Sequence, residues 1–301
     1  MKLRIAAAML AIYLVWGSTY LAIRFAVETI PPFIMAGTRY LIPGLLLLAW
    51  RRLTGDPAPT RRQWIAGAIV GLFLLLGGNG LVSWAEQRVE SGVAALIIGT
   101  VPIWMVLFDA ALARKWPRWQ VIVGLLIGLG GILLLIGPDS LFGGHPRYDL
   151  PGMGFLVLAA FLWAIGSVYS RDADLPPSPL LGTGIEMLAG SAGLYLASLV
   201  SGEWKAFNLA AVSHNSLLGL LYLILFGTLI GFVAYTWLLR NAPISLVSTY
   251  AYVNPLVAIL LGSWLAQEPL TWHVGLSAAI IIGSVVLINS FKRKPASAPA
   301  D

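Results

Sequence analysis

The sequence predicts an all-α membrane protein in which ten transmembrane helices form two inverted repeats of five helices each. Three observations support this fold class: the composition, the spacing of apolar stretches, and rare residues that recur half a chain apart. Of the 301 residues, 58% are hydrophobic and 11% are charged, whereas soluble domains average about 45–50% apolar and about 25% charged residues. A soluble fold lacks the polar surface to cover so many apolar side chains. The composition therefore argues against a cytosolic enzyme, a nucleic-acid binder and a disordered protein.

Apolar stretches of about 20 residues, the length that crosses a bilayer, occur ten times along the chain. The connections between them are short, and the longest, 138–151 and 201–215, leave no room for an extramembrane catalytic domain. The first stretch follows Lys2 and Arg4 as in a signal peptide, but it lacks a convincing cleavage site and is long enough to be a span. The predicted spans are 5–24, 33–50, 64–84, 92–112, 119–137, 152–170, 180–200, 216–238, 244–266 and 272–291.

Lysine and arginine are distributed unequally between the two sides of these spans. With the N-terminus in the cytoplasm, 14 of the 19 lie on the cytoplasmic side, four lie on the opposite side, and Arg39 lies inside a span. This bias predicts a multi-pass protein of a bacterial inner membrane with both termini in the cytoplasm. It also accounts for the net charge of +6 without an acidic partner. Residues 292–301 are expected to form a disordered cytoplasmic tail.

Rare residues recur at a nearly constant spacing, which predicts a duplication with residues 1–140 as the first five-helix unit and 150–291 as the second. Because each unit has an odd number of spans, the second copy must lie upside down in the membrane. Inverted repeats are typical of secondary transporters, whose substrate site lies near the midplane between the halves. The matching pairs are Trp84 and Trp237, Pro102 and Pro255, and Trp119 and Trp272 at an offset of 153, and Trp16 and Trp163 at an offset of 147.

Two charged residues lie deep inside predicted spans, at equivalent positions of the two repeats. Arg39 follows Trp16 by 23 residues, and Glu186 follows Trp163 by the same interval. A charge within the membrane is costly unless it is paired or hydrated. We expect the two to pair with each other, as a structural ion pair or near the transport site, or one of them to meet a charged group of a substrate. Glu186 is also a candidate for coupling to protons.

Two prolines at equivalent positions, Pro102 and Pro255, are predicted to lie inside helices. Each would leave a carbonyl group one turn earlier without its helical hydrogen bond. Free carbonyl groups at membrane depth are tolerated where they line a cavity or meet protein donors. The pattern indicates either a bend that serves gating or substrate contact, or a kink that serves packing alone.

Polar and aromatic residues gather in several spans and are predicted to line a central cavity. Amides and hydroxyls suit the polar ends of a small zwitterion or amphipathic metabolite, and aromatic faces suit an apolar or cationic part. A structural role in packing is the alternative for each tryptophan. The candidate lining residues are Trp16, Tyr20, Asn79, Trp84, Thr100, Trp104, Trp163, Tyr235, Tyr250 and Asn254.

Catalytic, metal and cofactor sites are not predicted. The chain has no cysteine and only three scattered histidines, which excludes thiolate chemistry and argues against a zinc site. No phosphate-binding loop of the G-x-x-x-x-G-K-[ST] type is present, so the chain itself is not expected to use ATP. A membrane-embedded enzyme and a channel-like pore are the alternatives to a carrier.

Several short segments resemble the drug/metabolite transporter superfamily in its ten-helix EamA-type branch. They are Trp16-Gly17-Ser18, Pro31-Pro32, Ala36-Gly37-Thr38-Arg39-Tyr40, Val253-Asn254-Pro255 and Gln267-Glu268-Pro269-Leu270. One departure is Arg114-Lys115-Trp116-Pro117, where the family often carries an acidic residue like Glu268.

The resemblance implies a secondary transporter that exports small metabolites across the inner membrane by alternating access between its repeats. An aromatic-amino-acid exporter belongs to this family, so amino acids, aromatic or otherwise neutral, are the favoured substrates. Relatives that export drugs, pigments or purines keep another amphipathic substrate open. The expected partners are a small-molecule substrate and the lipid bilayer, with no nucleic acid and no cofactor. The oligomeric state is not fixed by the sequence.

Overall fold

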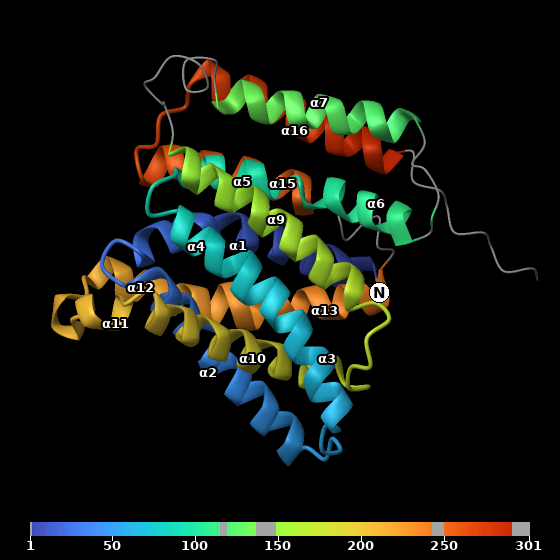
Figure 1. The fold of residues 1–301 in the computed structure, drawn as a ribbon, viewed down its shortest axis with the longest axis vertical. Coiled ribbons are helices and arrows are strands. Elements are labelled where there is room, and N and C mark those ends of the chain that lie inside the picture. The colour runs from blue at the N-terminus through green and yellow to red at the C-terminus, as the bar shows by residue number, and fades with distance from the viewer. Residues whose placement is uncertain (1, 113, 115–118, 137–148, 243–249, 291–301) are drawn as a thin grey trace, which may run out of the picture.

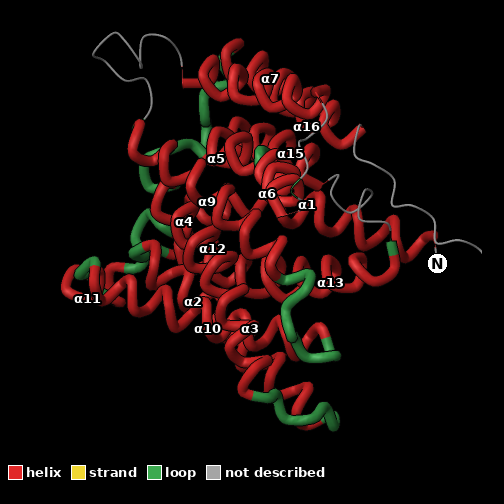
Figure 2. The backbone as a smooth tube through the Cα atoms, turned by 45° about the vertical axis from the view of Figure 1, so that its right-hand side comes forward, coloured by secondary structure: helices red, strands yellow, loops and turns green. Residues whose placement is uncertain are grey.

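The computed structural model describes residues 2–112, 114, 119–136, 149–242 and 250–290, and its regular elements are all helices (Figures 1 and 2). The predicted tail at 292–301 lies outside these residues. In the described part, seven helices are long and apolar enough to cross a membrane, and three shorter apolar helices complete the predicted ten.

The first repeat begins with α1 (Lys2–Ala26) and α2 (Pro32–Leu53). Its third span joins three helical segments end to end, and its fourth is broken into α5 and α6. The remaining elements of this repeat are α3 (Arg61–Gly71), η1 (Leu72–Gly80), α4 (Leu81–Ala85), α5 (Ser91–Ile98), α6 (Val101–Leu112) and α7 (Trp119–Ile136).

The second repeat follows the same order. It begins with α9 (Leu150–Tyr169) and α10 (Pro179–Val200), and the short α11 (Glu203–Ala206) and η2 (Leu209–Ala211) lead to a third span that is again composite. Pro179 starts α10 as Pro32 starts α2, at the repeat offset of 147; proline suits the first turn because its missing N–H needs no partner there. The other elements are α12 (His214–Tyr222), η3 (Leu223–Ile230), α13 (Gly231–Asn241), α15 (Tyr250–Leu265) and α16 (Trp272–Ser290).

Helices of one repeat pack against helices of the other in an exchanged pattern. Helix α1 contacts α12, α13 and α15 of the second repeat, while α9 contacts η1, α4, α5 and α6 of the first. Equivalent helices meet at the two edges of the molecule, where α7 lies beside α16 and α2 lies beside α10 (Figure 1). This exchange is the arrangement that a two-fold relation between inverted repeats produces, so the predicted fold class is confirmed.

Both third spans contain a π-helical segment at equivalent positions. The segments are η1 and η3, and an offset of 153 carries residues 72–80 onto 225–233, which overlaps the range of η3. π-Helical turns are rare and occur frequently at functional sites. Because η1 packs on α9 and η3 on α1, the two segments lie where the repeats meet.

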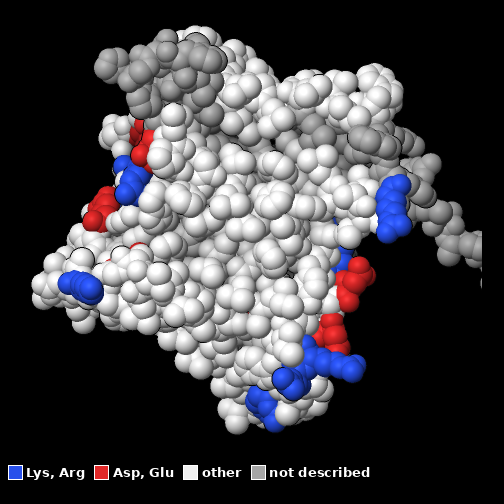
Figure 3. Space-filling model, in the orientation of Figure 1, with Lys and Arg blue, Asp and Glu red and all other residues white. Residues whose placement is uncertain are grey.

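The outer surface is that of a protein in a bilayer. On the face drawn in Figure 3, charged side chains lie towards the two ends of the helices, and a wide band between them carries none. Large apolar side chains such as Leu126 and Leu260 are about two-thirds exposed. Such side chains are accommodated by lipid tails, whereas in water they would expose large apolar patches.

Candidate functional site

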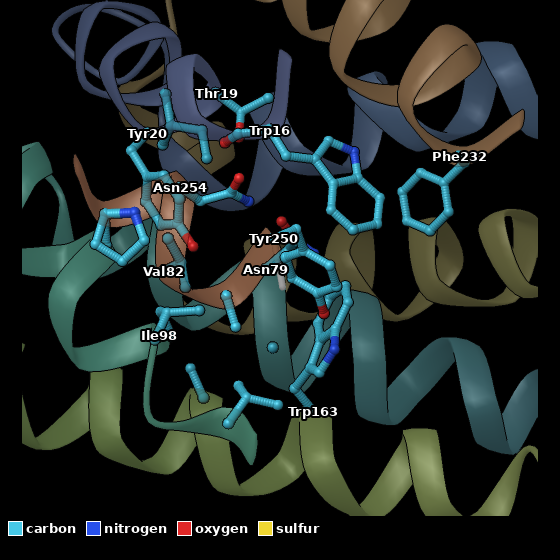
Figure 4. A pocket seen from close by; sticks show the side chains of 18 of the residues that line it. Trp16, Thr19, Tyr20, Asn79, Val82, Ile98, Trp163, Phe232, Tyr250 and Asn254 are labelled. Atoms are coloured by element: carbon cyan, nitrogen blue, oxygen red, sulfur yellow. The ribbon is translucent and has the colours of Figure 1, made fainter. Parts of the chain in front are cut away.

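A cavity of about 80 Å³ lies between the two repeats. Residues from α1, α2, the third and fourth spans, α9, α13 and α15 contribute to its wall (Figure 4). Its lining residues are Trp16, Thr19, Tyr20, Ile23, Arg39, Gly78, Asn79, Val82, Ala95, Ile98, Gly99, Val101, Ala159, Trp163, Phe232, Tyr250, Ala251, Asn254 and Pro255.

Trp16 is held at this wall by a hydrogen bond and three aromatic contacts. Its indole Nε1 donates to the carbonyl oxygen of Gly227 at 3.2 Å. The ring centre lies 5.5 Å from that of Phe232 and 5.2 Å from that of Tyr250, both edge-on, and 5.0 Å from that of Tyr235. Edge-to-face packing at these distances is favourable, so the indole keeps one orientation at the cavity.

Trp163 occupies the equivalent position in the second repeat and packs on a glycine of η1. A Cβ atom at Gly78 would lie 2.8 Å from its Cε3 atom, which is closer than side chains approach. Gly231 faces Trp16 in the same way, with a Cβ position 2.8 Å from the indole Cδ1 atom. Each tryptophan therefore depends on a glycine of the opposite repeat for its place at the wall.

Two asparagines supply amides to the cavity. Asn254 is 5% exposed, and with its amide oriented to donate, its nitrogen lies 3.2 Å from the carbonyl oxygen of Tyr250 and 3.3 Å from that of Tyr13. Asn79 enters from η1, one residue after Gly78. The wall thus combines amides with aromatic faces.

The two prolines take different places. Pro255 lies inside α15, as predicted, and lines the cavity. The prediction of Pro102 inside one continuous helix is wrong: α5 ends at Ile98 and α6 begins at Val101, so Pro102 lies in the first turn of α6, where proline is tolerated. The break at Gly99 packs against Pro255, because a Cβ at Gly99 would lie 3.2 Å from the proline Cγ atom.

Four other candidates for the lining lie outside the wall. Trp84 packs edge-on against Phe155 at 4.6 Å, with the guanidinium of Arg88 over its ring, and Trp104 packs against Phe161. Thr100 is buried in the break after α5 and donates to Ile97 at 2.6 Å. Tyr235 lies behind the wall, in contact with Trp16 and Tyr250.

The predicted pairing of Arg39 with Glu186 is wrong, because no ion pair or hydrogen bond joins these two described residues. Arg39 lines the cavity, and its Nε donates to Thr228 Oγ1 of η3 at 3.1 Å. Glu186 lies outside the lining, where its backbone carbonyl contacts Gly71 of α3. The guanidinium of Arg39 thus contacts the third span of the second repeat, whereas the backbone of Glu186 packs on the third span of the first.

A second acid within the bundle, Glu86, gives no sign of its burial in the sequence. It follows the last residue of α4, is fully buried, and neither carboxylate oxygen has a hydrogen-bond partner. Burial and the nearby carboxylate of Glu268 raise its pKa well above the ordinary value, while Arg24 and Arg39 oppose this. An acidic residue at the end of a span is expected to face water, so the sequence does not indicate that this one is buried.

Two further carboxylates tie the repeats together at the same end of the bundle. Glu268 accepts from the backbone N–H of Ser91 at 2.8 Å and of Gly92 at 3.1 Å, at the start of α5. Glu203 accepts from Phe33 and Ile34 at 3.2 and 3.0 Å, at the start of α2. Carboxylates suit helix N-termini because the free N–H groups there carry partial positive charge.

Comparisons with known proteins agree with this architecture. The model of the EamA-like transporter family matches residues 3–137 and 150–290. The Escherichia coli K12 protein described as the uncharacterized inner membrane transporter YedA is 40% identical over 297 residues, which cover 97% of this chain and 94% of that protein. The uncharacterized transporter sll0355 of Synechocystis is 25% identical over 96% of this chain and 90% of its own length.

A solved crystal structure supports the fold. Its TM-score is 0.64 at 22% sequence identity, and the alignment covers 94% of this chain and 95% of that one. Two inverted repeats around a shared cavity define a multi-pass transporter of the inner membrane. The chain belongs to the EamA-like transporter family, within the drug/metabolite transporter superfamily.

Proposed function

We propose that the protein is a secondary carrier that exports small amphipathic metabolites, with neutral amino acids, aromatic ones above all, as the favoured substrates. The observation that carries the proposal is the cavity, to which both repeats contribute an aromatic wall and amides. A small zwitterion needs polar partners at one end and an apolar surface at the other. The lining offers Asn79 and Asn254 for the first and Trp16, Trp163 and Tyr250 for the second.

The symmetry of the contacts supports alternating access. Because α1 and α9 each pack on the third and fourth spans of the opposite repeat, tilting one repeat exchanges two equivalent sets of contacts. A carrier of this type needs only a site that opens to one side at a time and an existing gradient, without ATP. Another amphipathic metabolite or drug is the nearest alternative, and its transport would use the same wall.

Counterflow in proteoliposomes tests the proposal. Vesicles loaded with unlabelled L-phenylalanine should accumulate labelled L-phenylalanine from outside, and a panel of other neutral amino acids and amphipathic metabolites should compete to different degrees. The absence of flux for every compound, with and without a proton gradient, would overturn the proposal. Single-channel currents would favour a pore, and a chemically altered compound would favour an enzyme.

A matched pair of tryptophan substitutions links flux to the cavity. Trp163→Phe should lower counterflow at least about tenfold because it removes lining surface, whereas Trp84→Phe makes the same chemical change outside the wall and should preserve most of the flux. Both variants must reach the membrane at the level of the unsubstituted protein. Equal losses in the two variants would separate transport from this cavity.

A further inference from the structure

Arg39 is a buried cation whose hydrogen-bonding capacity the protein leaves partly unused. The side chain is 3% exposed and lines the cavity. Nε donates to Thr228, and the guanidinium carbon lies 5.0 Å from the ring centre of Tyr40. Nη1, in contrast, is buried without any hydrogen-bond partner. Two contacts therefore fix the guanidinium in place and leave a donor free.

Within the described structure, no carboxylate neutralises this cation. Arg39 is the only charged side chain among the described lining residues, and no ion pair involves it. Glu86 lies near enough to feel its charge, yet both oxygens of that carboxylate lack hydrogen-bond partners. A buried charge without a counter-ion is costly, so an anionic group entering the cavity would gain the interaction that the protein leaves open.

Gly227 of η3 packs closely beside this site. A Cβ atom there would lie 2.9 Å from Cγ2 of the lining residue Thr19 and at van der Waals distance, 3.4 Å, from Nη2 of Arg39. Arginine binds carboxylates through two parallel hydrogen bonds. A single cation in an otherwise uncharged wall matches a singly charged carboxylate better than a phosphate group, which carries about −1.5 to −2.

We propose that Arg39 is the carboxylate-binding residue of the transport site, so that the substrates are small carboxylates with an apolar or aromatic body. The proposal rests on the proposed function, because it names the substrate class for the same cavity. Trp16, Trp163 and Tyr250 receive the apolar body, and Thr228 and Tyr40 hold the guanidinium in position.

The test compares two probes of nearly identical shape, 3-phenylpropionate and 3-phenylpropionamide, of which only the first carries a charge. Binding to the purified full-length protein is measured by the change in intrinsic tryptophan fluorescence. The unsubstituted protein should bind the carboxylate at least about tenfold more tightly than the amide. Arg39→Gln should remove this preference while retaining amide binding. Arg62→Gln, at an exposed arginine of α3, should leave the preference intact.

The ratio of the two affinities separates substrate binding from a structural role. Equal weakening of both probes in Arg39→Gln would show that the arginine only supports the fold, and equal binding of both probes by the unsubstituted protein would also overturn the inference. The second comparison needs no variant, so a folding failure of Arg39→Gln leaves the test intact. Thr228→Val keeps the guanidinium but removes the hydrogen bond that holds it. This variant should weaken binding of 3-phenylpropionate and leave binding of 3-phenylpropionamide unchanged.

The outcome also distinguishes this inference from the proposed function. Amide and carboxylate binding of equal strength, together with counterflow of amphipathic compounds, would retain the carrier and reject Arg39 as its carboxylate site. Failure of both probes to bind while counterflow of another metabolite proceeds would reject the carboxylate class alone. Absence of both binding and flux for every compound would reject the carrier and the inference together.

Discussion

Trp163 of α9 packs directly on Gly78 of η1, with its Cε3 atom 2.8 Å from the place where a Cβ atom would stand. The repeat-related pair, Trp16 on Gly231, has the same arrangement. Each pair joins one repeat to the other beside the cavity. The tryptophans thus belong to the wall only as long as the facing helix carries no side chain at that position.

Gly78→Ala should therefore displace Trp163 and lower counterflow at least about tenfold, because a methyl group cannot fit in the space that the indole occupies. The measurement is the initial rate of counterflow in proteoliposomes at matched protein density.

Gly154→Ala is the control for this substitution. It lies on the same helix as Trp163, no atom stands within 4 Å of its Cβ position, and alanine is the better helix former by about 0.8–1 kcal/mol. Full flux is expected. Normal flux in Gly78→Ala would show that Trp163 tolerates displacement and would weaken the assignment of the wall.

Glu268→Gln should destabilise the folded protein by about 1–2 kcal/mol, because the carboxylate accepts three hydrogen bonds at the start of α5, two from Ser91 and one from Gly92. The amide has one acceptor oxygen and no charge. Chemical unfolding in detergent micelles measures the loss, and Glu28→Gln, at an exposed glutamate, should cause little change. Equal stability of the two variants would show that the cap contributes nothing.

Glu86→Gln should raise stability more at high pH than at low pH. The pKa of Glu86 is raised in the folded protein by burial and by Glu268, so the folded state holds its proton more tightly than the unfolded state. The contribution of protonated Glu86 to the free energy of unfolding is then fully present below the ordinary pKa of 4.5 and declines as the pH rises towards the folded-state pKa. Glutamine is neutral throughout and removes this decline.

Unfolding measured between pH 5 and pH 8 checks the sign. The unsubstituted protein should lose stability over this range relative to Glu86→Gln, and Glu28→Gln should keep the slope of the unsubstituted protein. If Glu86→Gln instead became less stable than the unsubstituted protein as the pH rises, the carboxylate of Glu86 would be charged and stabilised in the folded state.

The charge exchange of Arg39→Glu with Glu186→Arg should recover no counterflow beyond the single variants. Thr228 holds the guanidinium of Arg39, and no ion pair or hydrogen bond joins Arg39 to Glu186 within the described structure. Double-mutant coupling between separated residues lies within about 0.3–0.5 kcal/mol of zero. Recovery of flux in the double variant would reveal a direct pair in another state of the cycle.

Local signals in the sequence predict the spans well. The bilayer requires long apolar runs across its hydrocarbon core and places charged residues at the ends of the spans. The duplication identifies Trp16 and Trp163 as equivalent residues of the two repeats, because tryptophan is rare enough for its recurrence to be informative. The break at Gly99 is signalled only in part: residues 92–112 form one apolar run, and Pro102, which has no N–H for the carbonyl of Ile98, is the local sign of an interruption. The contact of the break with Pro255 of the other repeat becomes evident only in the fold.

The cavity could be predicted only in part. Composition places Trp84 and Trp104 at membrane depth but does not fix the rotation of their helices, and this rotation directs them to Phe155 and Phe161 instead. For Asn79 and Asn254 the sequence does predict the interior, because an amide facing lipid is costly. The role of small residues such as Gly78 and Ala159 at the wall becomes evident only when the facing helices are known.

The carboxylate contacts between the repeats are not repeated symmetrically. Glu203 caps α2, and its counterpart Asp56 forms a hydrogen bond with Ser178 before α10. Glu268, however, corresponds to Lys115 at the offset of 153. In a carrier that alternates between two states, unequal carboxylate contacts between the repeats give the inward-facing and outward-facing states different free energies. Apparent affinity falls with the population of the competent state, so half-saturating concentrations measured from the two sides of the membrane are expected to differ.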